Sequence, residues 1–324
     1  MMRPRGSSRA TPGTKLPNFF VAGVPKAGTT SLYAYLRQHP RVFMSPVKEP
    51  MFFGARDLLS GPVREQFLRY LGRNPVHLRN FLEDTEQRRA RRYLLDWDDY
   101  VRLFEHADGE SAIGEASVDY FWLPSAAAAI HDVVPDAKLL FVLRHPADKL
   151  LSSFYVARRR QPDLAFRAWF EAATLPGAPS WPLVDGARYA THLERFFRVF
   201  PRHQIRIYLY DAFRTDPTAM LRDVFSFLGA EPHDFPIDTS QRHNEGVVPR
   251  WPRLHGWRRR LLGDARPTRL VPERIRERVF RLYYRSRADT IMRPEDRARV
   301  IDYYRTEIAR TEALLAQDLS SWLS

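Results

Sequence analysis

Short apolar runs alternate with longer amphipathic stretches along this chain. Between the apolar runs, leucines and aromatic residues recur every three or four positions, the spacing of a helix that packs on a core, as in 29–38 and 217–228. Strands that alternate with helices are typical of a mainly parallel sheet covered on both faces, so we predict an α/β fold of three layers. The runs with the length and composition of buried strands are 18–24, 111–115, 138–143 and 205–210.

Two of these strand ends carry residues suited to ligand binding. One follows Val24 and the other follows Leu143. In open α/β sheets, ligands bind at the carboxyl ends of the strands, and parallel strands end on the same edge. We therefore expect the segments after Val24 and Leu143 to contribute to one site.

Composition narrows the possible chemistry. The chain has a net charge of +13, with 51 basic residues of which five are lysines, and it has no cysteine. The absence of cysteine excludes disulfides, thiolate nucleophiles and cysteine-ligated metals, while the positive charge suits anionic ligands. No stretch approaches the roughly 20 apolar residues of a membrane span. We expect a flexible tail over 1–16, a single domain over 17–324 and a cytoplasmic protein.

The segment 23–31 has the features of an anion-binding loop. Gly23 and Gly28 let the backbone approach a ligand, the start of the following helix adds its dipole, and Lys26 adds a positive charge. The loop departs from a Walker A motif, which needs Gly-Lys-Ser/Thr, because Thr29 follows Gly28. The alternative is a glycine turn with a solvated lysine.

A second phosphate site is predicted at Arg144 and Ser152. Arg144 follows a strand, and Ser152 lies eight residues further on, in a predicted helix. An arginine fork at a strand end and a hydroxyl one or two turns later can meet on one phosphate. Taken alone this pattern is weak, and a surface arginine with an unrelated helix serine explains it better.

Together the two segments resemble the donor site of the sulfotransferases that use 3′-phosphoadenosine 5′-phosphosulfate (PAPS). Segment 25–31 resembles their 5′-phosphosulfate loop, which implies a P-loop-like fold and a lysine, here Lys26, at the bridging oxygen of the leaving group. The pair Arg144 and Ser152 resembles their 3′-phosphate site, and 242–250 resembles the late loop that closes over the donor. The resemblance implies PAPS as sulfuryl donor, 3′-phosphoadenosine 5′-phosphate (PAP) as product and no metal. The implied donor-binding residues are Lys26, Ala27, Gly28, Thr29, Thr30, Ser31, Arg144, Ser152 and Arg250.

An acceptor side is predicted at 45–53. Its Lys48-Glu49-Pro50-Met-Phe-Phe run is similar to sequences in bacterial sulfotransferases, and its Glu-x-x-Phe-Phe part is similar to the heparan sulfate sulfotransferases. The resemblance implies that Glu49 is the base that deprotonates the acceptor. Lys48 beside it is a candidate to keep Glu49 ionised or to steady the transferring group. The alternative is a turn with a solvated ion pair and two core phenylalanines.

Segment 114–120 resembles a strand end that touches the acceptor in the same family. Ala116 stands where the heparan-type enzymes have lysine, and Val118 where they have proline, so a heparan-like substrate is not implied. Asp119 and Tyr120 are candidates for acceptor contact. His145 neighbours Arg144 and is interpreted as a structural or donor-side residue.

These observations lead us to expect a sulfotransferase that acts on a hydroxyl or amine of a carbohydrate, lipid or small metabolite. The residues implied in catalysis are Lys26, Glu49 and Lys48. A P-loop-type nucleotide kinase is the first alternative, although it should carry lysine at position 29 and an acidic strand end for Mg²⁺. The second is a non-enzymatic basic protein that binds nucleic acid or a membrane surface. We expect neither nucleic acid nor integral membrane association.

Overall fold

The computed structural model describes residues 15–59, 64–65, 94, 96–158, 161, 163–175, 178, 181–240, 247–249, 284–286 and 292–324. Its centre is a five-stranded sheet with the strand order β2-β3-β1-β4-β5. Every neighbouring pair in this sheet is parallel, which confirms the predicted fold class. The strands are β1 (Phe19–Gly23), β2 (Val42–Met44), β3 (Ala112–Ala116), β4 (Lys138–Leu143) and β5 (Ile205–Leu209).

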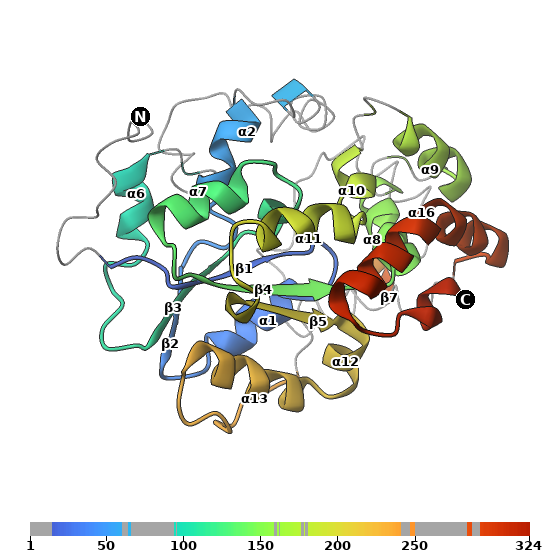
Figure 1. Ribbon diagram of the computed structural model, residues 1–324. Helices are drawn as coiled ribbons and strands as arrows, with labels where there is room; N and C mark the ends of the chain where they lie inside the picture. The colour runs from blue at the N-terminus through green and yellow to red at the C-terminus, as the bar shows by residue number, and fades with distance from the viewer. Residues whose placement is uncertain are drawn as a thin grey trace, which may run out of the picture.

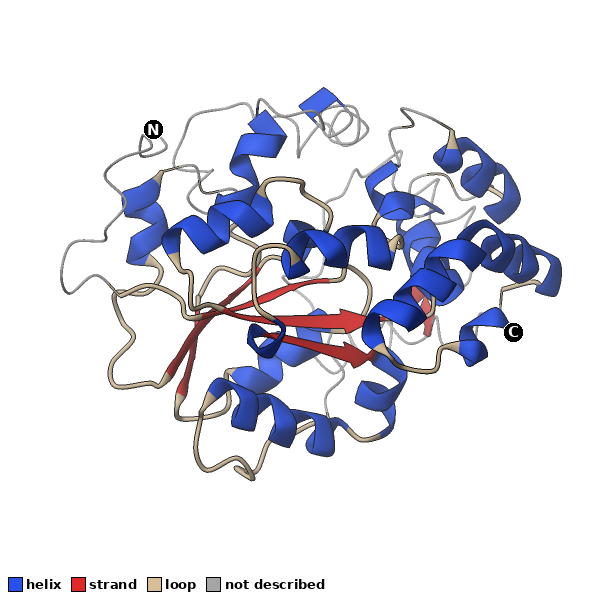
Figure 2. Cartoon of the chain, viewed as in Figure 1, coloured by secondary structure: helices blue, strands red, loops and turns tan. Residues whose placement is uncertain are grey.

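Helices cover both faces of the sheet and its carboxyl edge (Figures 1 and 2). One face carries α1 (Thr29–Leu36) and α13 (Pro217–Leu228), and the other carries α7 (Ala126–Val133) and α11 (Tyr189–Phe197). Near the strand ends lie α8 (Pro146–Arg158), α12 (Tyr210–Thr215) and α16 (Pro294–Leu315). The remaining helices are α2 (Ala55–Leu59), α6 (Trp97–Arg102), α9 (Phe166–Thr174) and α10 (Trp181–Asp185), with the 3₁₀ turns η1 (Phe52–Gly54), η2 (Val118–Phe121), η3 (Arg202–Gln204) and η6 (Ser320–Leu323).

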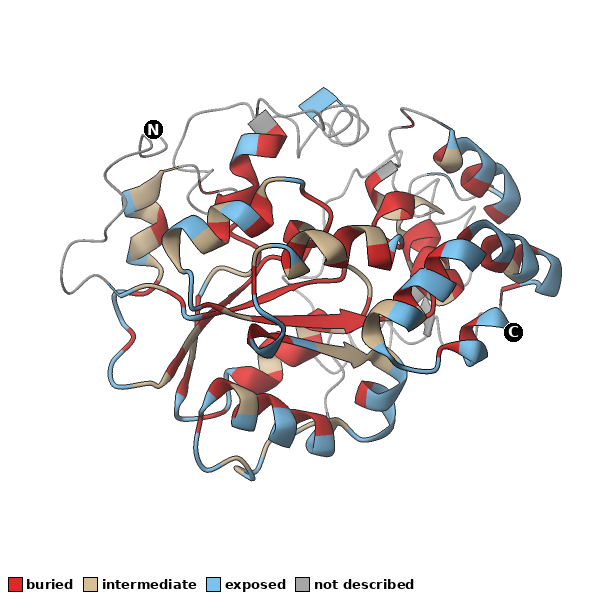
Figure 3. Ribbon diagram, viewed as in Figure 1, coloured by how far each residue is buried: buried red, intermediate tan, exposed pale blue. Residues whose placement is uncertain are grey.

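The central strands are buried on both faces, which explains their continuous apolar runs. All five residues of β1 are buried, and in β4 only Lys138 is partly exposed. Figure 3 shows the same concentration of buried residues along the middle of the sheet and the inner faces of its helices. A separate antiparallel pair is formed by β6 (Val247–Pro249) and β7 (Tyr284–Ser286).

The limits of the elements follow from local chemistry. Helix α13 begins after Asp216, whose carboxylate accepts the N–H of Ala219 at 2.9 Å, with Pro217 in the first turn. It ends at Gly229, which adopts a left-handed φ of 74°. The sequence predicted both ends of this helix.

Candidate functional site

Residues 23–31 connect β1 to α1 at the carboxyl edge of the sheet. The backbone takes left-handed φ values of 71° at Lys26 and 82° at Gly28. A Cβ at Gly28 would lie only 2.9 Å from Cε2 of Tyr210 and 3.0 Å from Cε1 of Phe213, so this part of the loop packs directly on α12. Gly28 is also the N-cap of α1, so no side chain at this position caps the helix start. A helix start of this kind is suited to an anion.

The other predicted donor residues of this loop differ in burial. Ala27, Thr29 and Ser31 are buried, whereas Lys26 and Thr30 are half-buried. Thr30 therefore carries the most accessible of the three hydroxyls that are predicted to bind the donor.

Arg144 lies directly beside this loop. It follows β4, the neighbour of β1, and the Val24 N–H donates to the Val142 carbonyl at 3.1 Å across the two strand ends. The Arg144 Nη1 donates to the carbonyl oxygen of Lys26 at 3.1 Å, and its guanidinium lies 4.6 Å from the ring centre of Tyr210. The two predicted phosphate sites therefore adjoin, as their positions at parallel strand ends predicted.

One N–H group of the Arg144 guanidinium, at Nε, is not used in the bonds described above. Among the residues that the structure describes, no hydrogen-bond acceptor lies against the buried Nε of Arg144. The backbone of Arg144 is fixed by Tyr189, whose buried hydroxyl donates to the Arg144 carbonyl at 2.6 Å. A fixed arginine with an unused N–H is prepared for an added acceptor such as a phosphate oxygen.

The remaining residues of the predicted donor site are less defined. Ser152 lies half-buried on α8, the helix that begins two residues after Arg144, and its role at the same phosphate stays a prediction. Arg250 lies outside the described residues. His145 is buried and accepts the Ala147 N–H at 3.1 Å, and its burial lowers its pKa to about 4, so the ring is neutral. This fits the structural role expected for His145.

The acceptor loop continues from β2 along β3. The N–H groups of Ser45 and Glu49 donate to the carbonyls of Gly114 and Ala116, both at 2.8 Å. Lys48 Nζ lies 2.7 Å from Glu49 Oε1 in a mostly buried ion pair. An ammonium at this distance favours the carboxylate form of a neighbouring acid, the form that a general base needs.

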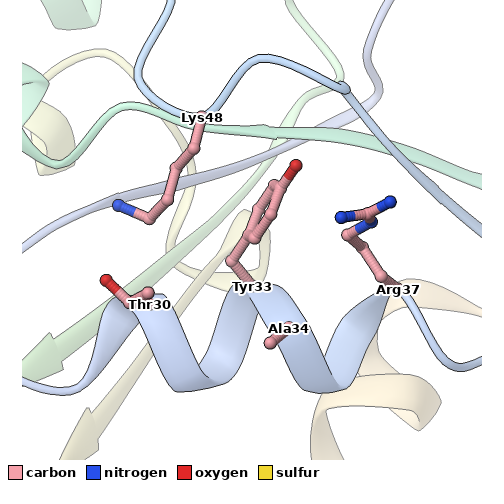
Figure 4. A pocket seen from close by; sticks show the side chains of 5 residues that line it. All are labelled: Thr30, Tyr33, Ala34, Arg37 and Lys48. Carbon is pink, nitrogen blue, oxygen red and sulfur yellow. The ribbon is translucent and has the colours of Figure 1, made fainter. Parts of the chain in front are cut away.

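A cavity of about 470 Å³ lies between α1 and this loop. Figure 4 shows Lys48 above the helix with its amino group extended toward the Thr30 end, and the Tyr33 ring standing between Lys48 and Arg37. The Tyr33 hydroxyl donates to the Ser45 carbonyl at 2.6 Å, and the Arg37 guanidinium lies 5.7 Å from the centre of its ring. The lining residues are Thr30, Tyr33, Ala34, Arg37 and Lys48. A residue of the predicted donor loop and one of the predicted acceptor loop thus line one cavity.

The structure corrects one expectation about the acceptor. Tyr120 is fully buried, and its hydroxyl accepts the Phe53 N–H at 3.2 Å, so its side chain faces the interior and not an acceptor. Asp119 is partly exposed and accepts the indole N–H of Trp122 at 3.2 Å, and its contact with the acceptor stays a prediction.

Sequence reasoning missed two residues that border the site. Tyr210, the first residue of α12, stacks on Arg144 and blocks any side chain at Gly28. Lys149 on α8 is 1% exposed and donates to the Leu183 carbonyl at 2.9 Å. Burial lowers the pKa of Lys149 to about 7, against the opposing effect of Asp185, while the charge of Lys26 lowers it further. The scarcity of lysine in this arginine-rich chain is the signal that pointed to Lys26 and Lys48, and it applied to Lys149 as well.

Residues 17–234 match the model of the sulfotransferase family. The chain belongs to this family. The match covers both loops described above, the strands that carry them, and the residues Lys26, Glu49, Arg144 and Ser152. The kinase and the non-enzymatic alternatives are therefore set aside.

Two curated relatives are named for heparan sulfate. The chain is 29% identical over 230 residues to the human bifunctional heparan sulfate N-deacetylase/N-sulfotransferase 3, covering 68% of this chain and 23% of that protein. It is 26% identical over 277 residues to the mouse heparan sulfate glucosamine 3-O-sulfotransferase 6, covering 83% of this chain and 69% of that protein. The chain thus spans about a quarter of the length of the bifunctional relative.

A solved structure shares the fold over nearly the whole chain. The sulfotransferase from Alicyclobacillus acidocaldarius is 29% identical, with a TM-score of 0.66 over 96% of this chain and 100% of that one. Within the described part of our chain, no helix is both long and apolar enough to cross a membrane. The same described residues include no group of three or more histidine, aspartate or glutamate side chains placed to hold a metal ion.

Proposed function

We propose that this sulfotransferase takes its sulfuryl group from PAPS and transfers it by in-line displacement to a hydroxyl or amine, with Glu49 as the general base. The observation that carries the proposal is the shared cavity, which Thr30 of the donor loop lines together with Lys48, the ion-pair partner of Glu49. An acceptor group in this cavity would lie beside the donor loop on one side and beside Lys48, which is paired with Glu49, on the other.

Two features favour a nucleotide with separate phosphate groups at its 3′ and 5′ ends. The buried Arg144 Nε lacks an acceptor among the described residues, and a charged N–H left in this state is costly, so a 3′-phosphate oxygen would stabilise it. The Gly28 turn excludes a side chain and leaves the start of α1 open to the 5′ end. We assign the 5′-phosphosulfate end to Lys26, Ala27, Gly28, Thr29, Thr30 and Ser31, and the 3′-phosphate to Arg144, Ser152 and Arg250.

The proposed step requires three charged side chains. Glu49 takes the proton from the acceptor as the acceptor oxygen or nitrogen bonds to sulfur. Lys26 offsets the negative charge that develops on the bridging oxygen as the bond from that oxygen to sulfur breaks, so that PAP leaves with the bonding electron pair. Lys48 keeps the Glu49 carboxylate oriented through the 2.7 Å ion pair.

We propose a carbohydrate as the acceptor class, because the two relatives described above are named for heparan sulfate. The buried Ala116 offers no charged contact at the position where those enzymes have lysine, so the proposal does not extend to heparan sulfate itself. The single domain over 17–324 and the cytoplasmic location stay predictions.

The test begins with identification of the acceptor. Incubation of the protein with labelled PAPS and a cell extract should label a carbohydrate, whereas a labelled lipid or small metabolite would contradict the acceptor class. With that acceptor, Glu49→Gln should lower kcat by about 10²–10⁴-fold, because the amide keeps the size of the side chain but cannot accept the proton. Calorimetry with PAP should show unchanged affinity.

Glu105→Gln is the matched control, since Glu105 is an exposed glutamate in the turn after α6. It should leave kcat and PAP affinity unchanged. Near-normal turnover of Glu49→Gln with the true acceptor would exclude Glu49 as the base.

A further inference from the structure

A buried polar cluster lies directly beneath the Glu49 loop, and the proposed mechanism does not use it. All of its members are fully buried. They come from α6, from the end of β3 and from the turn that follows it. The cluster consists of Tyr100, Glu115, Ser117 and Tyr120.

Two hydroxyls link Glu115 to the loop. The Ser117 hydroxyl donates to Glu115 Oε2 at 3.4 Å and accepts the Met51 N–H at 3.1 Å. The Tyr120 hydroxyl lies against the Glu115 carboxyl and accepts the Phe53 N–H at 3.2 Å. Each hydroxyl accepts a hydrogen bond from a loop N–H through an oxygen lone pair. It then donates its single hydrogen to Glu115.

The loop needs such support because its backbone is strained. Glu49 and Met51 adopt left-handed φ values of 65° and 60°, a conformation that is strained for residues with a Cβ. Conformations of this kind persist only where the surroundings fix them. The N–H groups of these two residues are the ones bonded to the Ala116 carbonyl and the Ser117 hydroxyl.

Aromatic packing closes the cluster from the other side. The Phe52 ring stacks on Tyr100 with centres 4.5 Å apart, and the Phe53 ring meets Tyr100 and Tyr120 edge-on at 5.3 and 6.1 Å. Burial raises the pKa of Glu115 to about 8, and Tyr100, Tyr120 and Ser117 are the polar groups that face it. Glu115 is therefore a neutral acid at neutral pH, and its oxygen Oε1 and the Tyr100 hydroxyl have no other partner among the described residues.

We propose that Glu115 is a positioning residue for Glu49: acting through Ser117 and Tyr120, it holds the strained loop in the conformation that points the base at the acceptor. The inference rests on the proposed function, because it takes Glu49 as the base. Glu115 touches neither donor nor acceptor. Its loss should therefore affect the proton-transfer step more than the binding of either substrate.

Two substitutions at Glu115 separate positioning from packing. Glu115→Leu introduces an apolar side chain of similar size that makes no hydrogen bonds. It should lower kcat by about tenfold or more, up to the loss expected for Glu49→Gln. The KM for the acceptor and the affinity for PAP should change little. Glu115→Gln, which still accepts from the two hydroxyls, should restore most of the turnover.

Glu307 provides a matched control on α16. It is a buried glutamate that accepts the Thr191 hydroxyl at 2.6 Å and the Thr191 N–H at 3.3 Å, in a part of the fold distant in sequence from either loop. Glu307→Leu removes these bonds together with the ion pair to Arg310 at 2.6 Å, and it should leave kcat unchanged. If Glu115→Leu fails to fold, Ser117→Ala cuts the same link with a smaller change and should also lower kcat.

A double mutant decides the question. In the Glu49→Gln background, Glu115→Leu should cost no further turnover, because there is no base left to position. Normal kcat in both Glu115→Leu and Ser117→Ala, or an equal loss in the Glu49→Gln background, would overturn the inference while leaving the proposed function intact. Normal turnover of Glu49→Gln would instead overturn the proposed function, and the inference with it.

Discussion

Replacing Arg144 by alanine should weaken binding of PAP without abolishing the fold. The side chain makes three contacts that alanine removes: the bond to the Lys26 carbonyl at 3.1 Å, the stack on Tyr210 at 4.6 Å, and the proposed bonds to the 3′-phosphate. The first two hold the donor loop and the arginine together in the free protein. The third exists only with ligand bound, so it determines the affinity.

The size of the effect follows from the number of bonds lost. A hydrogen bond to a charged group contributes about 1.5–3 kcal/mol, so the loss of one raises the dissociation constant about 10–150-fold. Calorimetry should show this rise for PAP, whereas AMP, which has no 3′-phosphate, should bind both proteins equally. Arg144→Lys keeps the charge but loses the planar fork, and we expect an intermediate affinity for PAP.

Arg202→Ala is the matched control for this experiment. Arg202 also donates through Nη1 to a backbone carbonyl, that of Ile205 at 2.7 Å, and it also lies over an aromatic ring, that of Phe197 at 5.3 Å. It precedes β5, at the opposite end of the sheet from the donor loop, so its loss should not change PAP affinity. Unchanged PAP affinity in Arg144→Ala, or an equal loss for AMP, would refute the assignment of the 3′-phosphate.

Three further predictions concern metal and pH. Activity should survive EDTA, because a sulfuryl group in transfer builds up less negative charge than a phosphoryl group and Lys26 can offset it; a loss that Mg²⁺ restores would contradict this. Between pH 4.5 and about 8, Glu115 keeps a proton in the folded protein that it loses in the unfolded chain. Urea titrations should therefore show that the unfolding free energy of the wild type falls relative to that of Glu115→Gln by about 1.4 kcal/mol per pH unit. Lys149 behaves in the opposite sense, because between about pH 7 and 10.5 the unfolded chain holds a proton that the folded side chain has lost. The wild type should therefore gain stability relative to Lys149→Met as the pH rises, and a constant difference would be evidence against the lowered pKa of Lys149.

The apolar pattern predicted the fold because the sheet is parallel and covered on both faces. Runs such as 138–143 are then apolar except for Lys138 at the start and are easy to recognise, and this one matches β4 residue for residue. The edge strand β2 has only three residues and was not among the four predicted strands. The pair β6 and β7 joins segments 35 or more residues apart and carries no local pattern that predicts it.

The two loops of the site were predictable because each is contiguous in sequence. Their partners come from elsewhere in the chain and were not. The predicted strand 205–210 included Tyr210, whereas β5 ends at Leu209 and Tyr210 begins α12 at the same sheet edge as Lys26 and Arg144. A strand end placed one residue too late thus concealed the aromatic residue that packs on both predicted phosphate sites.

Segment 114–120 shows why side-chain direction is harder to predict than position. A strand buried on both faces has no alternation of polar and apolar residues, so the sequence does not tell which side chains of β3 and η2 face the acceptor. The segment lies beside the Glu49 loop, yet Glu115, Ser117 and Tyr120 point inward and bond to one another and to that loop. If Glu49 is the base, these residues position the carboxylate that accepts the proton. The opposite wall of the cavity then determines which acceptor binds. Tyr33 and Arg37 on α1 form that wall, so substitutions there should change which acceptor is used before they change the rate of transfer.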